Sequence, residues 1–230
     1  MIHRFYGQFD FKERIINIKD QELVDQLHKV LRFRPGERIA LFNGSGKEAI
    51  CVIKLISAEE VVVEIQTISD SFKEGKKINL YLAVLKKENF ELALQKAVEC
   101  GITSITPIIT RRTVKLGLNL DRLERIVKEA AEQSGRGMLP TINGIVDFEE
   151  AAKTARGGKI IGHMYGKPFQ EIIGLKNEEI SIFIGPEGGW ETKEVEIARD
   201  NQIIPVDFGP RVMRAETAAI VSVFIASELM

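Results

Sequence analysis

The sequence has few of the side chains that hold metals, with 2 cysteines and 3 histidines among 230 residues. Cys51 and Cys100 lie far apart, neither belongs to a C-x-x-C pair, and no histidine cluster lies beside them. A structural zinc site is therefore not expected, and no other set of metal ligands stands out. A disulfide between the two cysteines is also disfavoured, because nothing else in the sequence indicates a secreted protein.

Long apolar runs and an excess of one charge are missing as well. No segment approaches the roughly 20 apolar residues that span a bilayer, and the first residues lack the charged and then apolar layout of a signal peptide. The 32 Lys and Arg residues nearly balance the 33 Asp and Glu residues, which gives a formal net charge of -1. We therefore expect a soluble, cytoplasmic protein in which any RNA-binding surface is a local patch.

The first 70 residues have the pattern of a small unit of short strands. Asp20 is a suitable N-cap for a helix that ends at Leu31. One face of this helix carries its apolar residues, Leu23, Val24, Leu27, Val30 and Leu31. Strand-like runs follow at residues 38–42, 49–56 and 61–68, and Asn-Gly-Ser-Gly at 43–46 suits a hairpin turn. Short strands joined by tight turns predict a small β-barrel.

A polar stretch at residues 71–77 is the predicted linker, and the pattern changes after it. Apolar runs typical of buried strands now alternate with amphipathic helical segments. The predicted strands are residues 78–85, 105–109, 159–164, 180–184 and 204–208. The predicted helices are residues 89–100, 121–134 with Asp121 as the cap, 192–201 and 215–229. This alternation predicts an α/β domain with a parallel sheet over residues 71–230.

Two loops near the C-terminus carry the clearest functional signal. The first is Gly-Pro-Glu-Gly-Gly at residues 185–189, which follows an apolar strand and precedes a helix start at Thr192. Glycines let backbone N–H groups approach a ligand closely, and in α/β sheets ligands bind beyond the carboxyl ends of strands. The spacing is not that of the G-x-G-x-x-G dinucleotide fingerprint. An ordinary strand-to-helix loop is the alternative interpretation.

The second loop spans residues 209–218 and reads Gly-Pro-Arg-Val-Met-Arg-Ala-Glu-Thr-Ala. It follows the strand at 204–208 and opens the apolar C-terminal helix. Two arginines and Glu216 at the start of a buried helix need partners, because unpaired charges are costly there. A ligand would supply such partners. The alternative is a surface cluster of salt bridges, which would contribute little to stability.

Basic residues gather in the N-terminal unit. They are His28, Lys29, Arg32, Arg34 and Arg38, with Arg4 as a further candidate. His28 and Arg32 are four residues apart, which places them on one helix face. Such side chains suit contacts to RNA phosphates, and Phe5, Tyr6 and Phe33 suit stacking on bases. A solvated helix face is the alternative interpretation.

Taken together, these segments resemble the bacterial 16S ribosomal RNA uridine-N3 methyltransferase family, which belongs to the SPOUT class. The loops at 185–189 and 209–218 are the most specific points of similarity. The supporting segments are residues 28–32, 35–37, 86–90, 95–101, 111–114 and 129–136. The resemblance implies a parallel SPOUT sheet with a C-terminal trefoil knot, a PUA-like barrel over residues 1–70, and a homodimer. General topology rules would instead predict an unknotted, doubly wound sheet.

The resemblance further implies S-adenosylmethionine as the cofactor. Three loops supply the residues carried over to its pocket, which are Met164, Tyr165, Ile184, Gly185, Pro186, Glu187, Gly188, Gly189, Phe208, Gly209, Val212, Met213, Arg214, Thr217 and Ala218. The sequence departs from the family's pattern at Ala215, where threonine is usual.

For the substrate, the resemblance implies methylation of N3 of a uridine in 16S ribosomal RNA of the small subunit, at position 1498. Arg214 is the first candidate for stabilising charge on the uracil, and Arg136 is the second. Glu216 is a candidate proton acceptor, or alternatively holds Arg214. Residues expected to contact RNA are Arg4, His28, Lys29, Arg32, Arg34, Arg112, Gln133 and Ser134. Two other functions stay open, a non-catalytic RNA-binding protein and a ribose 2′-hydroxyl methyltransferase.

Overall fold

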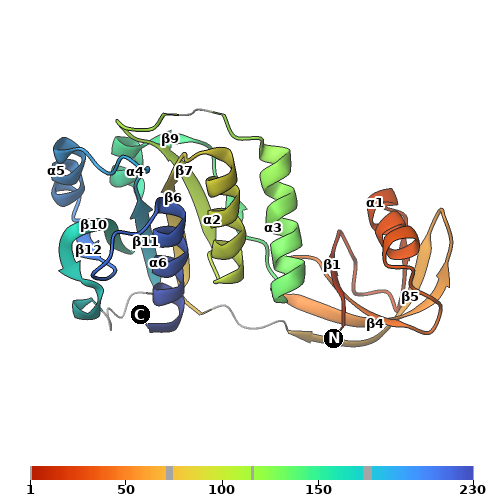
Figure 1. The fold of residues 1–230 in the computed structure, drawn as a ribbon. Helices are drawn as coiled ribbons and strands as arrows, with labels where there is room; N and C mark the ends of the chain where they lie inside the picture. The colour runs from red at the N-terminus through yellow and green to blue at the C-terminus, as the bar shows by residue number, and fades with distance from the viewer. Residues whose placement is uncertain (1, 71–74, 115–116, 173–177, 230) are drawn as a thin grey trace. The chain divides into compact units, whose positions relative to one another are not determined.

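The computed structural model describes residues 2–70, 75–114, 117–172 and 178–229 of the chain. These residues belong to two compact units (Figure 1). The first contains Met1–Lys73 and Ala131–Leu139, and the second contains Glu74–Ala130 and Pro140–Met230.

A five-stranded sheet forms the first unit, in the order β1-β3-β4-β5-β2. Its strands are β1 (Arg4–Tyr6), β2 (Ile15–Ile18), β3 (Arg38–Phe42), β4 (Lys47–Ile56) and β5 (Val61–Asp70). Neighbouring strands are antiparallel except for β1, which runs parallel to β3. The sheet curls around a buried core that includes Phe5, Leu27, Leu41 and Ile53. The three predicted strands are confirmed, and β1 and β2 are additional.

One helix packs into the core of this sheet. It begins as α1 (Gln21–Asp25), and Asp20 caps it as predicted, its carboxylate accepting a backbone N–H at 2.9 Å. It continues as a π-helix, η1 (Gln26–Val30). The wider π turn changes the direction in which the following side chains point. The predicted apolar face is therefore wrong at its end, where Val30 is 72% exposed and Leu31 is 37% exposed.

The second unit is built on a parallel sheet in the order β12-β10-β11-β6-β7-β8, with β9 also paired to β7. Its strands are β6 (Lys77–Ala83), β7 (Ser104–Ile109), β8 (Thr141–Ile142), β9 (Val146–Asp147), β10 (Gly158–Pro168), β11 (Glu179–Ile184) and β12 (Ile204–Asp207). Its helices are α2 (Lys87–Glu99), α3 (Leu120–Ser134), α4 (Phe148–Thr154), the 3-10 helix η2 (Phe169–Glu171), α5 (Thr192–Asp200) and α6 (Ala215–Leu229). The end of α3 belongs to the first unit.

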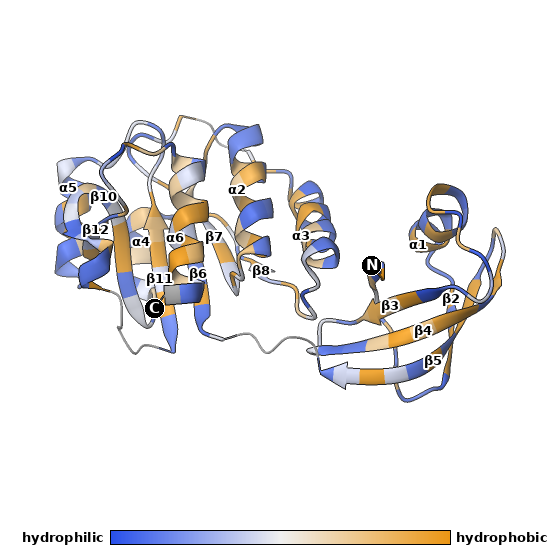
Figure 2. Cartoon of the chain, turned by 60° about the horizontal axis from the view of Figure 1, so that its bottom comes forward, coloured by the Kyte–Doolittle hydropathy of each residue, from blue (hydrophilic) through white to orange (hydrophobic). Residues whose placement is uncertain are grey.

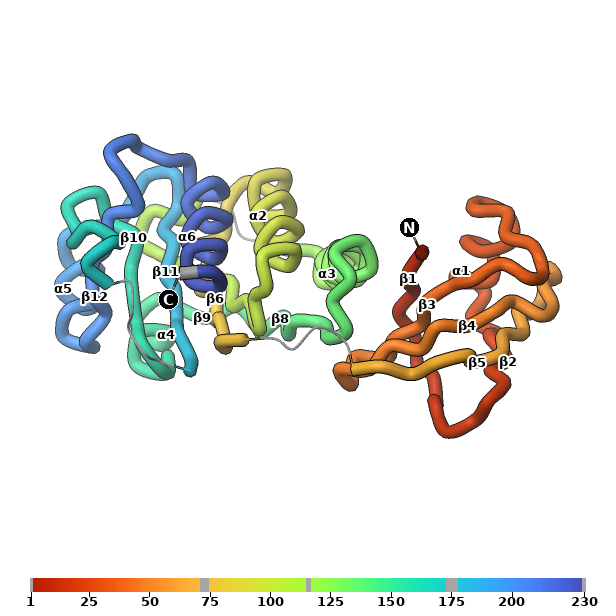
Figure 3. Tube along the Cα trace, turned by 90° about the horizontal axis from the view of Figure 1, so that it is seen from below, coloured from red at the N-terminus to blue at the C-terminus, as the bar shows by residue number. Residues whose placement is uncertain are grey.

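Helices cover both faces of the parallel sheet, with α2 and α6 packed together on one face and α4 and α5 on the other (Figure 3). The central strands are accordingly apolar (Figure 2), as a sheet buried on both sides requires. On one of these faces the Tyr81 ring stacks on Phe183, with ring centroids 4.5 Å apart, and Phe183 meets Phe148 of α4 edge-on at 5.9 Å. The predicted α/β fold with a parallel sheet is confirmed.

Two predicted helix starts are wrong. The helix predicted from residue 89 begins at Lys87 as α2. The sequence predicts Asp121 as the cap of α3, but that helix begins at Leu120 and the Asn119 side chain accepts the Arg122 N–H at 3.0 Å. Asn and Asp are equally good caps, so the local pattern does not distinguish two candidates that lie two residues apart.

The strand order determines which loops meet. Because all strands of this sheet are parallel, their carboxyl ends lie along one edge, and β10 lies between β12 and β11. The loops after β11 and β12 and the excursion at residues 163–166 within β10 are therefore neighbours. The trefoil knot stays a prediction. Among the described helices, none combines the length and the apolar character that a membrane span requires.

Candidate active site

A cavity of about 790 Å³ opens at the carboxyl ends of β10, β11 and β12. Nearly all the residues predicted for the cofactor pocket line it, together with the candidate Glu216. They are Met164, Tyr165, Ile184, Gly185, Pro186, Glu187, Gly188, Gly189, Phe208, Gly209, Val212, Met213, Arg214 and Ala218. Thr217 is exposed and is not among the lining residues. The two sequence loops thus form walls of one cavity.

The loop after β11 requires its glycines for steric and conformational reasons. A Cβ on Gly185 would lie 2.8 Å from the indole ring of Trp190, closer than real Cβ contacts occur. Gly189 has a φ of 70°, in the left-handed region that favours glycine, and its N–H donates to the Pro186 carbonyl at 2.9 Å. The result is a tight turn with backbone exposed to the cavity.

Trp190 links two of the three loops, and it is not among the site residues predicted from the sequence. Its Nε1–H donates to the carbonyl of Gly162, at the end of the paired part of β10, at 2.9 Å. Its ring also packs against Phe148, with centroids 4.9 Å apart. Its position directly after the glycine loop was the only signal in the sequence that pointed to it.

The loop contributed by β10 is an outward excursion within that strand, which spans Gly158–Pro168. Gly162 and Lys167 both pair with Val206 of β12, so the four residues between them leave the sheet. Within this excursion the Tyr165 N–H donates to Nδ1 of His163 at 3.2 Å, and Tyr165 is 85% exposed. His163 lines the cavity. The loop therefore offers accessible side chains at the cavity wall.

The loop after β12 leads into α6 and carries a buried carboxylate. Gly209 has a φ of 148°, and its N–H donates to the Asp207 side chain at 3.0 Å. Glu216 is only 6% exposed, and its buried Oε2 has no hydrogen-bond partner among the described residues. In the described chain no ion pair joins it to Arg214, which is exposed. A buried carboxylate oxygen without a donor is costly, so a ligand that donates to this oxygen would lower that cost.

The cavity also contains cationic side chains from outside the three loops. Lys86 and Asn89 line it beside the predicted RNA-binding residue Arg112. The Arg112 guanidinium donates from Nη1 to the Gly188 carbonyl at 2.7 Å, and its Nε lies 3.9 Å from Glu191 Oε1. In the second unit, Arg112 is thus tied to the glycine loop after β11. Ala215 is buried in the same wall, 7% exposed.

The remaining predicted RNA-binding residues all belong to the first unit. They are Arg4, His28, Lys29, Arg32, Arg34, Gln133 and Ser134. The catalytic candidate Arg136 belongs to the same unit. Arg4 pairs with Glu48 through Nε at 2.8 Å, and its guanidinium lies 3.4 Å from where a Cβ on Gly135 would be. The Tyr6 N–H donates to Glu132 at 2.9 Å. These contacts place Arg4 beside the segment that carries Gln133, Ser134 and Arg136.

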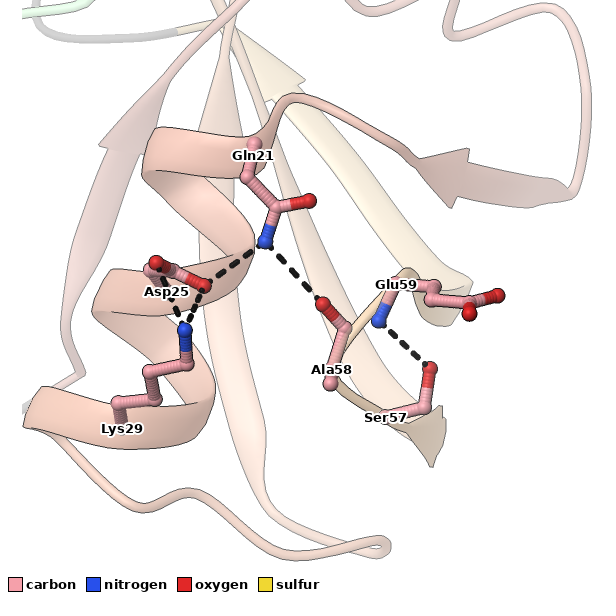
Figure 4. A network of polar contacts seen from close by, with 6 residues as sticks. All are labelled: Gln21, Asp25, Lys29, Ser57, Ala58 and Glu59. Atoms are coloured by element: carbon pink, nitrogen blue, oxygen red, sulfur yellow. Dashed lines mark hydrogen bonds and ion pairs between the residues drawn. The ribbon is translucent and has the colours of Figure 1, made fainter.

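Lys29 is held in a polar network. Its ammonium group lies 2.9 Å from Asp25, whose carboxylate also accepts from Gln21, and Gln21 donates to the Ala58 carbonyl at 3.1 Å (Figure 4). The hydrogen bonds from Lys29 and Gln21 lower the pKa of Asp25. The ion pair with Asp25 offsets part of the positive charge that Lys29 would present to an RNA phosphate.

The expected base stacking is wrong for one aromatic residue. Phe5 is 2% exposed and belongs to the core of the first unit. Phe33 is half-buried against it, edge-on at 6.2 Å, and Tyr6 packs against Phe42 at 5.5 Å. The core of a small unit needs large apolar side chains. Phe5 is one of them, so its ring is not available to stack on a base.

No metal site is present within the described ranges, where no group of three or more His, Cys, Asp or Glu side chains is placed to hold an ion. Cys51 is buried and Cys100 is half-buried, and both are free.

Two family models match the chain, an RNA methyltransferase domain over residues 73–227 and an RNA methyltransferase PUA domain over residues 27–66. The chain is similar to the ribosomal RNA small subunit methyltransferase E of Rickettsia conorii, at 29% identity over 213 residues that cover 90% of this chain and 87% of that protein. The protein of the same name from Mesomycoplasma hyopneumoniae is 31% identical over 176 residues, covering 74% of this chain and 77% of its own length.

Solved structures are similar over nearly the whole chain. The ribosomal RNA small subunit methyltransferase E of Neisseria gonorrhoeae, crystallised with S-adenosyl methionine, matches with a TM-score of 0.90 and 28% identity, covering 97% of this chain and 95% of that one. A methyltransferase described as putative, from Legionella pneumophila and solved with bound SAM, matches with a TM-score of 0.88 and 28% identity, covering 98% of each chain.

Proposed function

Because this chain belongs to the ribosomal RNA small subunit methyltransferase E family, we propose that it methylates 16S ribosomal RNA of the small subunit with S-adenosylmethionine as donor. The acceptor atom is N3 of one uridine, that at position 1498 in the usual rRNA numbering. The observation that carries the proposal is the cavity where three loops converge beside a buried carboxylate that lacks a donor.

The residues present fit the proposed cofactor. The cavity of about 790 Å³ is within the range of roughly 300–1,000 Å³ typical of small-molecule sites. Gly185 and Gly189 line it with backbone groups, which can pair with the hydroxyl, amine and ammonium groups that S-adenosylmethionine carries. When bound, the cofactor supplies a methyl group on a positively charged sulfonium sulfur.

The chain's task in the reaction is to position the uracil and to manage its proton. N3 attacks with its electron pair, the carbon–sulfur electrons pass to sulfur, and the N3 proton leaves. The negative charge that develops is shared by O2 and O4, and a cation beside them stabilises the transition state more than the ground state. Arg214 provides that cation, with Arg136 as the second candidate. Glu216 accepts the proton through its unpaired Oε2.

The two domains proposed for the chain have separate tasks. A PUA-like unit at residues 1–70 binds RNA, and a domain at residues 71–230 carries out the methyl transfer. Arg4, His28, Arg32 and Arg34 contact RNA from the first of these. The acceptor edge of a uridine is occupied in a duplex, so the base is presented unpaired. Because the chain has almost no net charge, it acts on the assembled small subunit, not on free RNA.

The proposed assembly is a homodimer that lacks a metal. Apolar side chains on the surface of α6 support it, since Phe224 is 53% exposed on a helix that is apolar along most of its length (Figure 2). A two-fold dimer would bury this side chain against its copy.

One pair of measurements tests the function. Calorimetry with S-adenosylmethionine should show binding, and nucleoside mass spectrometry of 16S rRNA from small subunits treated with protein and cofactor should show 3-methyluridine. A chain that binds no cofactor would instead be a non-catalytic RNA-binding protein. A product methylated on the ribose 2′-hydroxyl would contradict the base specificity. Equal activity on naked 16S rRNA would contradict the requirement for the subunit.

A further inference from the structure

Glu194 is a buried carboxylate that the proposed reaction does not use. It is 3% exposed and lies at the third position of α5, where a glutamate commonly accepts the backbone N–H of the cap residue. It does so here, since Glu194 Oε2 accepts the Glu191 N–H at 2.8 Å. This capping contact accounts for only one of the two carboxylate oxygens. On an exposed helix water would pair with the other oxygen, but burial requires a partner from the protein.

The second oxygen of Glu194 joins α5 to a distant loop. Its Oε1 accepts the Arg111 N–H at 2.9 Å, across 83 residues of chain. Arg111 and Arg112 lie in a tight turn after β7, which the Thr113 N–H closes by donating to the Thr110 carbonyl at 3.1 Å. In the sheet β6 lies between β7 and β11, so strand pairing does not hold the loops after these two strands together. The Glu194 carboxylate joins them at the start of α5, which follows the glycine loop.

The turn that Glu194 fixes carries the side chain that holds the glycine loop. Arg112 Nη1 donates to the Gly188 carbonyl at 2.7 Å. In the same peptide unit, the Gly189 N–H donates to the Pro186 carbonyl at 2.9 Å. A peptide unit with glycine on both sides rotates more freely than one flanked by residues with a Cβ. Because both of its polar groups are bonded, this peptide has a defined orientation in the cavity wall.

Further contacts connect the same residues. Arg112 Nε lies 3.9 Å from Glu191 Oε1, and the Glu191 side chain accepts the backbone N–H of Glu194. Gly188 leaves room for the arginine stem, because a Cβ there would lie 3.3 Å from Arg112 Cδ. If the bond to the Arg111 N–H is lost, the turn after β7 can shift, and the Arg112 guanidinium shifts with it. The glycine peptide then loses the donor that selects its orientation.

We propose that Glu194 is a positioning residue for the cofactor site. Through Arg112, it holds the peptide between Gly188 and Gly189 in the orientation that binds S-adenosylmethionine. This rests on the proposed function. Glu194 is not among the described residues that line the cavity, so its effect on the cofactor passes through Arg112. Arg112 thereby has a task toward the cofactor loop, in addition to the RNA contact expected from the sequence.

The test is a double-mutant cycle on the full chain, measured by calorimetry with S-adenosylmethionine in the absence of RNA. Glu194→Gln keeps the shape of the side chain, but its NH₂ group cannot accept one of the two N–H bonds. Arg112→Met removes the donor to the Gly188 carbonyl from an exposed side chain. Glu196→Gln is the matched control, since Glu196 is an exposed glutamate of the same helix. Ala198→Gly is the stability control, since it weakens α5 at a buried position without removing these hydrogen bonds.

We expect E194Q and R112M each to weaken cofactor binding by about three- to tenfold, as the loss of one hydrogen bond predicts. The double variant should bind no more weakly than R112M, because both changes act on the same contact. E196Q should match wild type. A198G should lower the thermal midpoint, while its cofactor Kd stays within about twofold of wild type.

Several results would overturn the proposal. One is a wild-type Kd in E194Q or in R112M. Another is losses that add in the double variant, because Glu194 would then not act through Arg112. A third is an A198G variant that binds as weakly as E194Q, because the effect would then be one of stability alone. If E194Q does not fold, Glu194→Asp replaces it, since the shorter carboxylate keeps the charge but reaches less far. If the wild-type chain binds no S-adenosylmethionine, the proposed function fails, and that outcome is seen before any variant is compared.

Discussion

Replacing Trp190 by phenylalanine tests whether the walls of the cavity depend on one indole. The change keeps an aromatic ring against Phe148 but removes the Nε1–H that donates to the Gly162 carbonyl at 2.9 Å. A neutral hydrogen bond in a half-buried site contributes about 0.5–1.5 kcal/mol. If this bond holds the excursion within β10 against the loop after β11 in the binding arrangement, its loss weakens cofactor binding by about twofold to tenfold.

Calorimetric titration of Trp190→Phe with S-adenosylmethionine measures this change directly. The control is Phe148→Leu, which disturbs the same aromatic cluster but removes no hydrogen bond to the loops. This control should lower the thermal midpoint while the cofactor Kd stays near that of wild type. A Trp190→Phe variant whose Kd equals that of wild type would refute the reasoning, because the bond would then be structural only.

Three further predictions follow from buried and paired groups. Glu216→Gln should reduce methylation by about 100-fold or more, as expected for a lost proton acceptor. It should leave the thermal midpoint unchanged or raise it, because an unpaired buried charge is removed. Full activity of this variant would exclude Glu216 from proton transfer. Burial raises the pKa of the Cys51 thiol to about 12. Iodoacetamide at pH 8 should therefore leave Cys51 unlabelled in the native protein and label it after denaturation, as measured by peptide mass spectrometry. Labelling of the native protein would contradict the burial of this thiol. The Arg122 guanidinium lowers the pKa of Glu91, so their bond stabilises the fold above the unfolded pKa of the carboxyl, and this contribution is lost as pH falls through the lowered folded value. Arg122→Met should therefore lower the free energy of unfolding at pH 7 by less than about 1 kcal/mol, because the pair is partly solvated, and the difference from wild type should shrink as pH falls below about 4. A difference that stays constant with pH would contradict an ionic origin.

Much of the second unit could be predicted from local pattern. The predicted helix at residues 215–229 has the bounds observed for α6, and the predicted strand at 180–184 is β11 apart from one residue. Both segments are long or strongly apolar, so the spacing of their apolar residues is enough to predict the type of element. The short strands β8 and β9 and the helix α4 were missed because two to seven residues do not establish a period.

The first unit shows where local pattern stops being sufficient. The strand β1 has three residues and pairs with β3 more than thirty residues later, so its existence depends on a distant partner. The π turn at η1 is a second case, because the apolar spacing through Leu31 fits an α-helix while the chain turns Val30 outward. The burial of Phe5 is a third case, because only the folded sheet shows that its ring belongs to the core.

The sequence by itself determined the two loops at residues 185–189 and 209–218, the α/β fold and the SPOUT family resemblance, since glycines, strand ends and helix starts are local properties of the chain. Only the tertiary structure decided that these loops share a cavity with Lys86, Asn89 and Trp190, and that Glu216 is buried there without a donor. The physical reason is the pairing of parallel strands. β6 pairs with β11 across about a hundred residues, and no local pattern states which strand lies beside which.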